Sequence, residues 1–586
     1  MAGWRGASSR REALFALLLA ALTLALYRAA FGVFFSTDDL LFLLRADGQV
    51  PWGMGTRRLL SVRVFFSAGW QLFGERPALF HLAILLLHAA NAWLLARLAG
   101  RLGLGETGGW LAALLFVFSP VAFTCLHWIS GVQDVLMASF AIAAVWVWLR
   151  PGRLAEPLAL LLYLCALLSK EAAYLLPIAA LVLPGSALPG APAGRRARRL
   201  RALLALAPGL VLLYTGGALT PRPAGDPYAA AYGANILWNA LTYSAWLLRL
   251  WTPFPDQVPQ YEPSLWRWGL VLPLALGLLA VWRPRWRAAV GAAALVALVL
   301  VAPVLPLVRH SYLYYLYLPL APLWLLAAAG LARLPLPSPR WALLAPLLLA
   351  ALCAWRLEAR TAMTLEGKLQ ADPMLRYGAL VEAAVRELRA EPTPPQGEVL
   401  AIAPFVGEAV DLAAGLRATP GARRVQFLPV DKALYQGAAV PLFFPAVTSF
   451  RVLSALPGVE PGADPAWQRS ELYLLSGLTD FRYLGRGEVG RRELTRVLFQ
   501  QRYLREAIRE VEVLQALHPD DPDLLYDRGV LALVTGDAAG AEAIRARLAA
   551  LAAAAPDRAG QALRDFEAAL ARAASAAADR AAGSAR

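Results

Sequence analysis

The sequence predicts a polytopic α-helical membrane protein with a C-terminal soluble α/β segment and a helical tail. Hydrophobic residues make up 59% of the chain and charged residues only 17%, which is far from the composition of a soluble domain. About eleven apolar runs of spanning or near-spanning length follow one another, separated by short connections. After residue 356 the composition becomes that of a soluble chain.

The apolar runs predict about eleven spans, some of them short enough to be tilted or partly buried in the bundle. They lie at residues 13–35, 78–98, 110–123, 132–149, 154–168, 172–188, 202–219, 268–282, 288–308, 313–331 and 341–355. Runs this long and continuous do not fit the strands of a membrane barrel. The first run exceeds the apolar part of a signal peptide, so we interpret it as a retained span.

The distribution of arginine predicts the orientation, because cytoplasmic loops are enriched in basic residues. Alternate connections carry the arginines: the N-terminus and residues 97–101, 150–153, 195–201, 283–287 and 333–340. The connections between them, at residues 36–77, 127–128, 169–171 and 309–310, should face outward. An odd number of spans would also place the region after residue 356 on the outer side.

Residues 235–251 are amphipathic, rich in Trp and Tyr, and followed by several prolines. We interpret them as a helix in the outer membrane interface. If this helix crossed the membrane, the C-terminal region would be cytoplasmic. The net charge of +15 is explained better by orientation and anionic lipid than by nucleic acid, so no nucleic-acid partner is expected. Cys125, Cys165 and Cys353 form no disulfide pattern.

Four regions are expected: a membrane domain at 1–356, a helical connector at 357–396, a small α/β domain at 397–490 and a helical tail at 491–586. Within the α/β domain, a strand at 399–403, a helix at 408–416 and a strand at 425–430 suggest a βαβ-like fragment. The spacing of small residues and Pro in the tail resembles one tetratricopeptide repeat. An ordinary helical hairpin fits it equally well. The last residues, 574–586, are expected to be frayed.

Two adjacent acids, Asp38 and Asp39, directly follow the first apolar run. Ionised groups at a membrane boundary are costly to desolvate and are often functional. The alternative is that they begin a helix, a position that suits Asp. The outward loop 36–77 that contains them also has five arginines, against the orientation bias. Binding of an anion would explain why an outward loop carries so many arginines.

A series of short motifs occurs in a fixed order along the membrane region. They are the Asp pair at 38–39, Arg-Arg-Leu-Leu-Ser at 57–61, Leu-Phe-Gly at 72–74, Phe-His-Leu at 80–82, Phe-Ser-Pro at 118–120, Trp-Ile-Ser-Gly at 128–131 with Asp134, Ser-Lys-Glu at 169–171, and the Tyr-rich segment 309–319. The ordered set resembles the GT-C superfamily of membrane glycosyltransferases, closest to the transmembrane O-mannosyltransferases with a tetratricopeptide tail. Three departures are Ser119 and Cys125, where that family has His and Glu, and the absence of Arg before Asp134.

The resemblance implies transfer of a sugar from a polyprenyl-phosphate donor to a hydroxyl of a protein or glycan acceptor on the outer face. Under that reading Asp38 is the general base and Asp39 its positioning partner or a second base. The remaining assignments are Arg309, Arg58 and Lys170 for the lipid phosphate, Tyr312, Tyr314 and Tyr317 for the head group or the lipid groove, and His127, Asp134 and Glu171 in supporting roles. Arginine suits bidentate contact with phosphate.

Each assignment has a structural alternative. Glu171 could form a salt bridge with Lys170 that caps a helix, Asp134 could simply start one, and the tyrosines could form an aromatic belt. His81 and His88 are interpreted as packing residues within the second span. No metal ion and no cofactor are expected, because no motif supplies a set of metal ligands.

Two other functions remain open from sequence. One is a transporter or flippase for a lipid-linked sugar, although inverted repeats and interrupted helices near the midplane are not evident. The other is a membrane-anchored scaffold that binds a protein partner through the tail. In every case the expected location is a bacterial-type inner membrane or its equivalent.

Overall fold

The structure is a computed structural model that describes residues 9–53, 55–183, 192–217, 220, 222–223, 225–249, 252–254, 260–335, 338–364, 369–403, 428–453, 456, 466–476 and 479–584. The chain divides into two compact units. Unit 1 consists mainly of Met1–Ala379, and unit 2 mainly of residues 380–586. The division therefore falls after the expected end of the membrane domain at residue 356.

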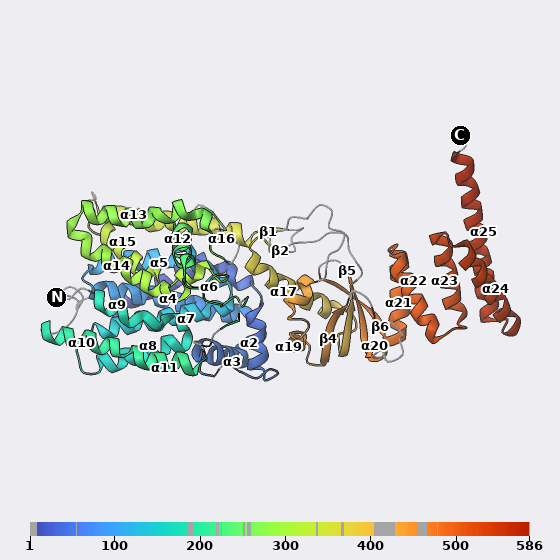
Figure 1. The fold of residues 1–586 in the computed structure, drawn as a ribbon, viewed down its shortest axis with the longest axis horizontal. Helices are drawn as coiled ribbons and strands as arrows, with labels where there is room; N and C mark the ends of the chain where they lie inside the picture. Colours follow the sequence, from blue (N-terminus) through green and yellow to red (C-terminus); the bar gives the residue numbers. More distant parts are fainter. Residues whose placement is uncertain are drawn as a thin grey trace. The chain divides into compact units, whose positions relative to one another are not determined.

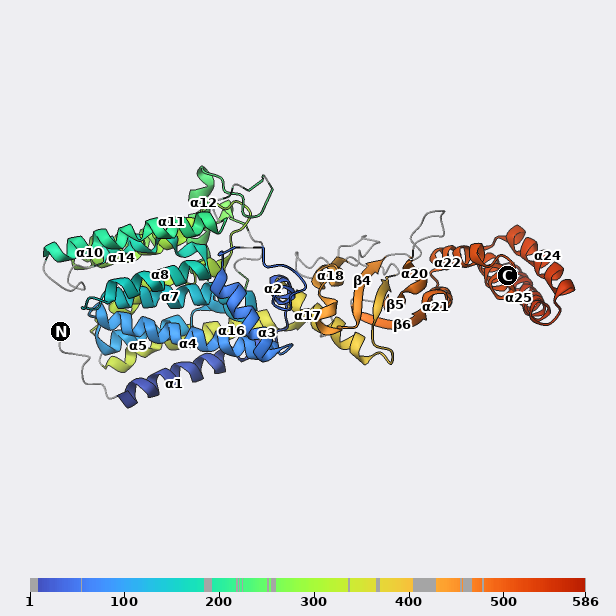
Figure 2. The same cartoon turned by 90° about the horizontal axis from the view of Figure 1, so that it is seen from below.

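Unit 1 is a bundle of helices (Figures 1 and 2). They are α1 (Ser9–Leu26), α2 (Asp38–Ala46), α3 (Phe65–Phe73), α4 (Pro77–Arg101), α5 (Gly105–Val117), α6 (Phe123–His127), α7 (Val132–Trp148), α8 (Ala155–Ser169), α9 (Leu176–Val182), α10 (Pro192–Leu204), α11 (Leu206–Thr215), α12 (Ala234–Leu248), α13 (Trp266–Trp282), α14 (Arg287–Val301), α15 (Leu320–Leu331) and α16 (Leu344–Thr361). A two-stranded hairpin, β1 (Met363–Thr364) and β2 (Leu369–Gln370), and the start of α17 (Pro373–Ala390) follow. Helix α4 packs against α1, α5 and α7, and α7 packs against α8.

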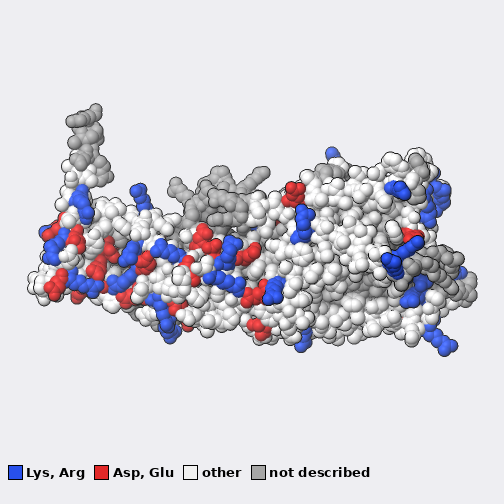
Figure 3. All heavy atoms as spheres, turned by 180° about the vertical axis from the view of Figure 1, so that it is seen from behind, with Lys and Arg blue, Asp and Glu red and all other residues white. Residues whose placement is uncertain are grey.

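Unit 1 has the helices of an integral membrane protein. Within the described residues, five are long and apolar enough to cross a bilayer: Pro77–Arg101, Ile129–Trp148, Pro263–Trp282, Pro284–Val304 and Arg340–Thr361. A sixth crossing is possible if the bent pair Gly105–Val117 and Pro120–His127 counts as one span. Figure 3 shows few charged side chains over most of the visible face of unit 1, and many over unit 2. The expected number of about eleven spans stays a prediction.

Two segments differ from their expected structure. The first apolar run is not one helix, because α1 ends at Leu26 and a 3-10 turn, η1 (Arg28–Gly32), follows. The expected outward loop 36–77 is largely helical and contains α2, a π-helical turn η2 (Leu59–Val64) and α3. Its residues 59–73 are apolar and bury Val62 and Phe66, which explains why they form a helix.

Helix α12 confirms the expected helix over 235–248, and it packs against α13. Trp251, the expected last residue, lies outside the described residues. Whether α12 lies in the interface or spans stays a prediction.

The arginine-rich connections that were expected on one side do lie together. Arg97 at the end of α4 pairs with Glu12 in α1. Arg198 in α10 donates a hydrogen bond to the carbonyl of Arg150 at the end of α7. Arg101 is close enough to both Arg97 and Arg150 for electrostatic repulsion. One end of the bundle is therefore basic, as the orientation rule requires of a cytoplasmic end.

Unit 2 contains a four-stranded sheet in the order β4-β3-β5-β6. Strand β3 (Gly397–Ile402) is parallel to β4 (Val447–Leu453) and β5 (Glu471–Ser476), whereas β6 (Asp480–Arg486) is antiparallel to β5. Strand β3 confirms the predicted strand at 399–403. The predicted helix at 408–416 lies outside the described residues. The described part of the predicted strand at 425–430 instead begins α18 (Leu428–Ala433).

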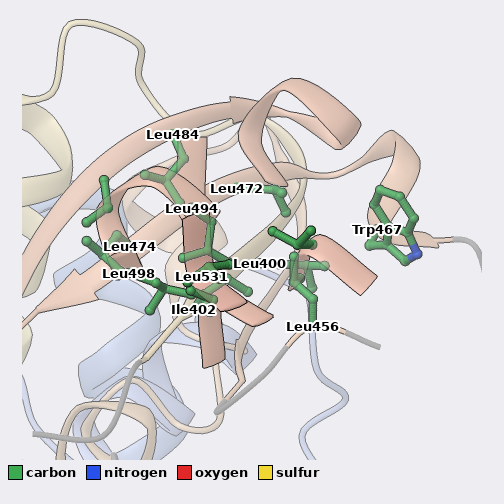
Figure 4. Close-up of a cluster of buried hydrophobic side chains, with 13 residues drawn as sticks. Leu400, Ile402, Leu456, Trp467, Leu472, Leu474, Leu484, Leu494, Leu498 and Leu531 are labelled. Atoms are coloured by element: carbon green, nitrogen blue, oxygen red, sulfur yellow. The ribbon is translucent and has the colours of Figure 1, made fainter. Parts of the chain in front are cut away.

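The sheet shares its core with the helices that follow it (Figure 4). The helices of unit 2 after α17 and α18 are α19 (Val440–Phe443), α20 (Ala466–Arg469), α21 (Gly487–Gln500), α22 (Leu504–Leu517), α23 (Pro522–Thr535), α24 (Ala538–Ala554) and α25 (Arg558–Ser584). One buried cluster joins Leu472 and Leu474 of the sheet to Leu494 of α21, Val511 of α22 and Leu531 of α23. The expected boundary at 490 therefore falls inside α21, and the first tail helices belong to the α/β core.

The end of the chain also differs from expectation. Helix α25 continues to Ser584, so residues 574–584 extend a helix rather than fray. A second buried cluster holds the last helices together and includes Leu525, Ile544, Leu548 and Phe566. The tetratricopeptide resemblance of this region stays a prediction.

Candidate functional site

Asp39 is a buried carboxylate that fixes the start of α2. Its side chain is only 1% exposed. One carboxylate oxygen accepts a hydrogen bond from the backbone N–H of Ser36, 3.0 Å away, an interaction like half of a capping box. The other accepts bonds from both the backbone N–H and the hydroxyl of Ser130, which lies 91 residues later in the turn η4 (Ile129–Gly131). Asp39 thus joins α2 to the segment that precedes α7.

Asp38 is half-buried and follows a strained residue. Thr37 has φ 44° and ψ −114°, which is an unfavourable conformation for a β-branched residue. Arg58 also has positive φ, 54°. Strained residues tend to cluster at functional sites, where the surrounding structure holds them in place. Arg58 and Arg45 are the cations that interact electrostatically with Asp38.

Two adjacent arginines share one carboxylate beside Asp38. Arg58 binds Glu171 in a bidentate manner, with Nε 3.0 Å from Oε2 and Nη2 2.7 Å from Oε1. Arg57 Nη2 lies 3.0 Å from Oε1 of the same Glu171. Two guanidinium groups and one carboxylate leave this group with one net positive charge. Arg57 Nε is buried and has no hydrogen-bond partner among the described residues.

Lys170 and Asp134 form a second, separate ion pair. Lys170 Nζ lies 2.7 Å from both carboxylate oxygens of Asp134, and both side chains are almost fully buried. The ammonium also sits 4.8 Å from the ring centroid of Tyr314 and 4.6 Å from that of Tyr315, in cation–π contact. The alternative of a Lys170–Glu171 bridge that caps a helix is therefore wrong, because each residue pairs with a different element.

A group of aromatic rings surrounds the two ion pairs. The His310 ring lies 4.1 Å from that of Tyr228 and 4.7 Å from that of Tyr312, measured between centroids. Tyr312 stacks on Tyr314 at 5.0 Å. His310 is close enough to Lys170 for the two to interact electrostatically. His310 Nε2 is buried without a partner among the described residues.

The pKa values of these groups follow from burial and from the neighbouring charges. Burial raises the pKa of Asp38, against the lowering effect of Arg58 and then Arg45. Burial raises the pKa of Asp39 to about 7, although its hydrogen bonds favour the ionised form. Burial acts to raise the pKa of Glu171, but Arg58 and Arg57 outweigh it and hold that pKa well below its ordinary value. Burial, followed by the charge of Lys170, lowers the pKa of His310 to about 3, so its imidazole is neutral at pH 7.

Most of the predicted site residues therefore meet in one cluster. The cluster contains eight of the residues predicted from sequence: Asp38, Asp39, Arg58, Asp134, Lys170, Glu171, Tyr312 and Tyr314. They come from segments between residues 38 and 314, and they lie at the start of α7 and the end of α8. The basic connections lie at the opposite ends of the same two helices. The cluster is therefore at the end of the bundle that was expected to face outward.

Three predicted residues lie elsewhere. Arg309 is exposed on the turn beside His310, and no contact among the described residues joins it to Asp38. Tyr317 points into the bundle, where its hydroxyl lies 2.6 Å from His88 Nδ1. His127 is fully buried and its ring stacks on Phe123 at 4.3 Å. Tyr317 thus has a hydrogen-bond partner inside the bundle, whereas His127 bonds only to the carbonyl of Phe123 in its own helix among the described residues.

The predicted packing role of two histidines is confirmed. His81 is buried between the carbonyl oxygens of Leu126 and Val33, and His88 contacts Tyr317.

Four residues of the cluster were not predicted as site residues: Arg57, Tyr228, Tyr315 and His310. Arg57 and Tyr315 directly adjoin predicted residues and lie in the same motifs. His310 adjoins Arg309, but no feature of the sequence indicates that its side chain is buried on this polar turn. Tyr228 lies in an irregular segment without periodicity, so its position depends on tertiary structure alone.

Among the described residues, no group of three or more His, Cys, Asp or Glu side chains has an arrangement that could hold a metal ion.

Comparison with known proteins gives a distant structural likeness. No family model matches the sequence, and no curated protein matches it. A match among solved structures is the single-particle cryo-EM structure of the arabinofuranosyltransferase AftD from Mycobacteria, with a TM-score of 0.42 and 18% sequence identity. The match covers 84% of this chain but only 37% of the AftD chain.

Proposed function

We propose that this protein is a membrane glycosyltransferase that moves a sugar from a polyprenyl-phosphate donor to an acceptor hydroxyl at the outer face. One observation carries the proposal. Acids, arginines and aromatic rings from segments between residues 38 and 314 converge at one end of the bundle, around the half-buried Asp38. The motifs that resemble the GT-C superfamily supply most of these residues.

Asp38 is the proposed general base. A base near the membrane surface must accept a proton at neutral pH, and an intermediate pKa serves this purpose best. Burial raises the pKa of Asp38 from its ordinary value, while Arg58 keeps the carboxylate available in its ionised form. The acceptor hydroxyl gives its proton to Asp38, its oxygen forms a bond to the anomeric carbon, and the bond from that carbon to the phosphate oxygen breaks. The electron pair leaves with the lipid phosphate.

The leaving phosphate needs fixed positive charge, which the Arg57–Arg58–Glu171 group supplies. This group retains one net positive charge, and Arg57 Nε is a buried donor without a protein partner. Glu171 orients both guanidinium groups and so reduces the reorganisation required when the anion arrives. The exposed Arg309 serves as an additional cation at the rim.

The aromatic group is the proposed contact surface for the sugar. Tyr228, Tyr312 and His310 place ring faces and one unpartnered imidazole nitrogen beside the charged cluster. The Lys170–Asp134 pair is buried behind Tyr314 and Tyr315, where its role is to position the rings.

The substitution Asp38→Asn tests the proposal. In purified protein reconstituted with polyprenyl-phosphate pentoses or hexoses and glycan or peptide acceptors, the variant should lose at least a hundredfold in the release of lipid phosphate, which is the low end of a general base's contribution. The matched control is Asp47→Asn, an exposed acid at the other end of α2. Sugar transfer that survives in a folded Asp38→Asn protein would refute the role of Asp38.

A further inference from the structure

A groove lies between helices of unit 1, apart from the charged cluster. It is a groove of about 630 Å³ bounded by α7, α9, α14 and α15 and by the end of α4. Small residues create the space: Ala289, Ala292 and Ala293 line it from α14, and Ala321 and Ala329 from α15. The α14 residues recur at helical spacing and so form one continuous face. The walls are apolar along most of the groove.

The charged residues among the described lining of the groove are Arg285 and Arg333. Arg285 lies in the turn η8 (Pro284–Trp286) just before α14, and Arg333 lies just after α15. The guanidinium of Arg333 is 5.7 Å from the ring centroid of Trp286, which also lines the groove. Two cations and an indole therefore mark one end of an otherwise apolar groove.

This end is the one opposite the proposed glycosyltransferase site. Helix α14 runs from the arginine end to Val301, and the chain then reaches His310 in the aromatic group. Helix α15 starts just after Tyr317 and ends beside Arg333. The arginine end also belongs to the connections whose basic character predicts the cytoplasmic side. Tryptophan is common at that depth, where the head groups begin.

We propose that this groove binds an anionic glycerophospholipid of the cytoplasmic leaflet, with its phosphate at Arg285 and Arg333 and its acyl chains along the alanine face. Basic pockets between transmembrane helices on the cytoplasmic side recognise anionic lipid head groups in this way. Arginine can hold a phosphate through two parallel hydrogen bonds. The charge argues against the chain of a polyprenyl donor as the occupant, because the donor phosphate belongs at the other end, beside Asp38.

The test compares two double variants of the full-length protein that lose the same charge. The variant Arg285→Ala/Arg333→Ala removes the two groove arginines, and Arg283→Ala/Arg287→Ala removes two exposed arginines of the same region that do not line the groove. Native mass spectrometry would measure the binding of phosphatidylglycerol and of phosphatidylcholine to each. The groove variant should bind phosphatidylglycerol roughly thirtyfold more weakly, and the control should bind like the wild type.

A third variant keeps the charge and fills the space. Ala292→Phe should weaken binding of both lipids while the protein keeps its wild-type thermal stability. Equal losses in the two arginine variants would show only a general effect of charge and would overturn the proposal. Polyprenyl phosphate that displaces phosphatidylglycerol equally well from the wild type and from Arg285→Ala/Arg333→Ala would assign the groove to the donor chain. Since none of these measurements depends on sugar transfer, the lipid site can fail or stand independently of the proposed enzyme.

Discussion

Arg58 is the residue on which the electrostatics of the candidate site depend. It is held by a bidentate bond to Glu171, and it is the main cation that lowers the pKa of Asp38. Its positive φ of 54° is unusual for a side chain of this size. A residue in an uncommon backbone conformation thus carries the guanidinium that binds Glu171 and interacts electrostatically with Asp38.

Removal of this charge should change the pH dependence of sugar transfer. In Arg58→Gln the pKa of Asp38 should rise further, because burial then acts without its main opposing charge and Arg57 alone is left to balance the carboxylate of Glu171. Asp38 would hold its proton up to a higher pH, so the acidic limb of kcat/KM should move to higher pH. The measurement is the pH–rate profile of both proteins.

Two further variants separate charge from structure. Arg45→Gln removes the weaker of the two opposing cations and should shift the limb less. The double variant Arg58→Gln/Glu171→Gln restores the charge balance and should return the limb toward the wild-type position. If the acidic limb of the kcat/KM profile has the same pH position in Arg58→Gln as in the wild type, the ionisation of Asp38 does not determine that limb.

At the scale of elements, the junction between α2 and the turn η4 depends on Asp39. Burial raises the pKa of Asp39 from 3.8 to about 7, so the folded protein binds this proton more tightly than the unfolded chain does. The resulting stabilisation is fully present below about pH 4 and is lost as the pH rises through 7. The thermal stability of the wild type should therefore fall as the pH rises from about 4 to 7, and the thermal stability of Asp39→Asn should fall less.

The hydrogen bonds of Ser130 provide the control for this pH effect. The Ser130 hydroxyl favours the ionised form of Asp39, so Ser130→Ala should raise the pKa of Asp39 and move the loss of stability to higher pH. Identical pH profiles for the wild type and Asp39→Asn would contradict the assignment.

The elements also show what the sequence could and could not predict. The Asp pair and the apolar runs of α4, α7 and α14 were predictable, because composition and order along the chain determine them locally. The helices in residues 59–73 were missed because charged residues precede that apolar segment and made the whole stretch look like a loop. The partner of Glu171 was not predictable, since Arg58 lies 113 residues earlier and adjacent Lys170 is an equally suitable partner by sequence. Tyr317 was assigned to the site from the resemblance of the Tyr-rich segment and His127 from its outward turn, but both side chains lie inside the bundle.

At the scale of the whole molecule, the two units differ in the polarity of their surfaces. Unit 1 exposes apolar side chains on its helices, as a protein solvated by lipid does. Unit 2 is charged on its surface and buries its own core, which extends from strand β3 to helix α23. Helices α21 to α23 therefore belong to the same core as the sheet.

A pair of truncations tests this conclusion. Deletion of residues 491–586 would remove Leu494, Val511 and Leu531 from the cluster that covers Leu472 and Leu474 of the sheet. Exposure of that much apolar surface should unfold unit 2, because each large buried side chain contributes about 1.5–3 kcal/mol. Deletion of residues 538–586 removes only helices α24 and α25, which belong to the second cluster. Hydrogen exchange in β3 and β5 should therefore become fast in the first truncation and stay slow in the second. Slow exchange in both would show that the sheet folds without α21–α23, and the boundary expected at residue 490 would then be correct.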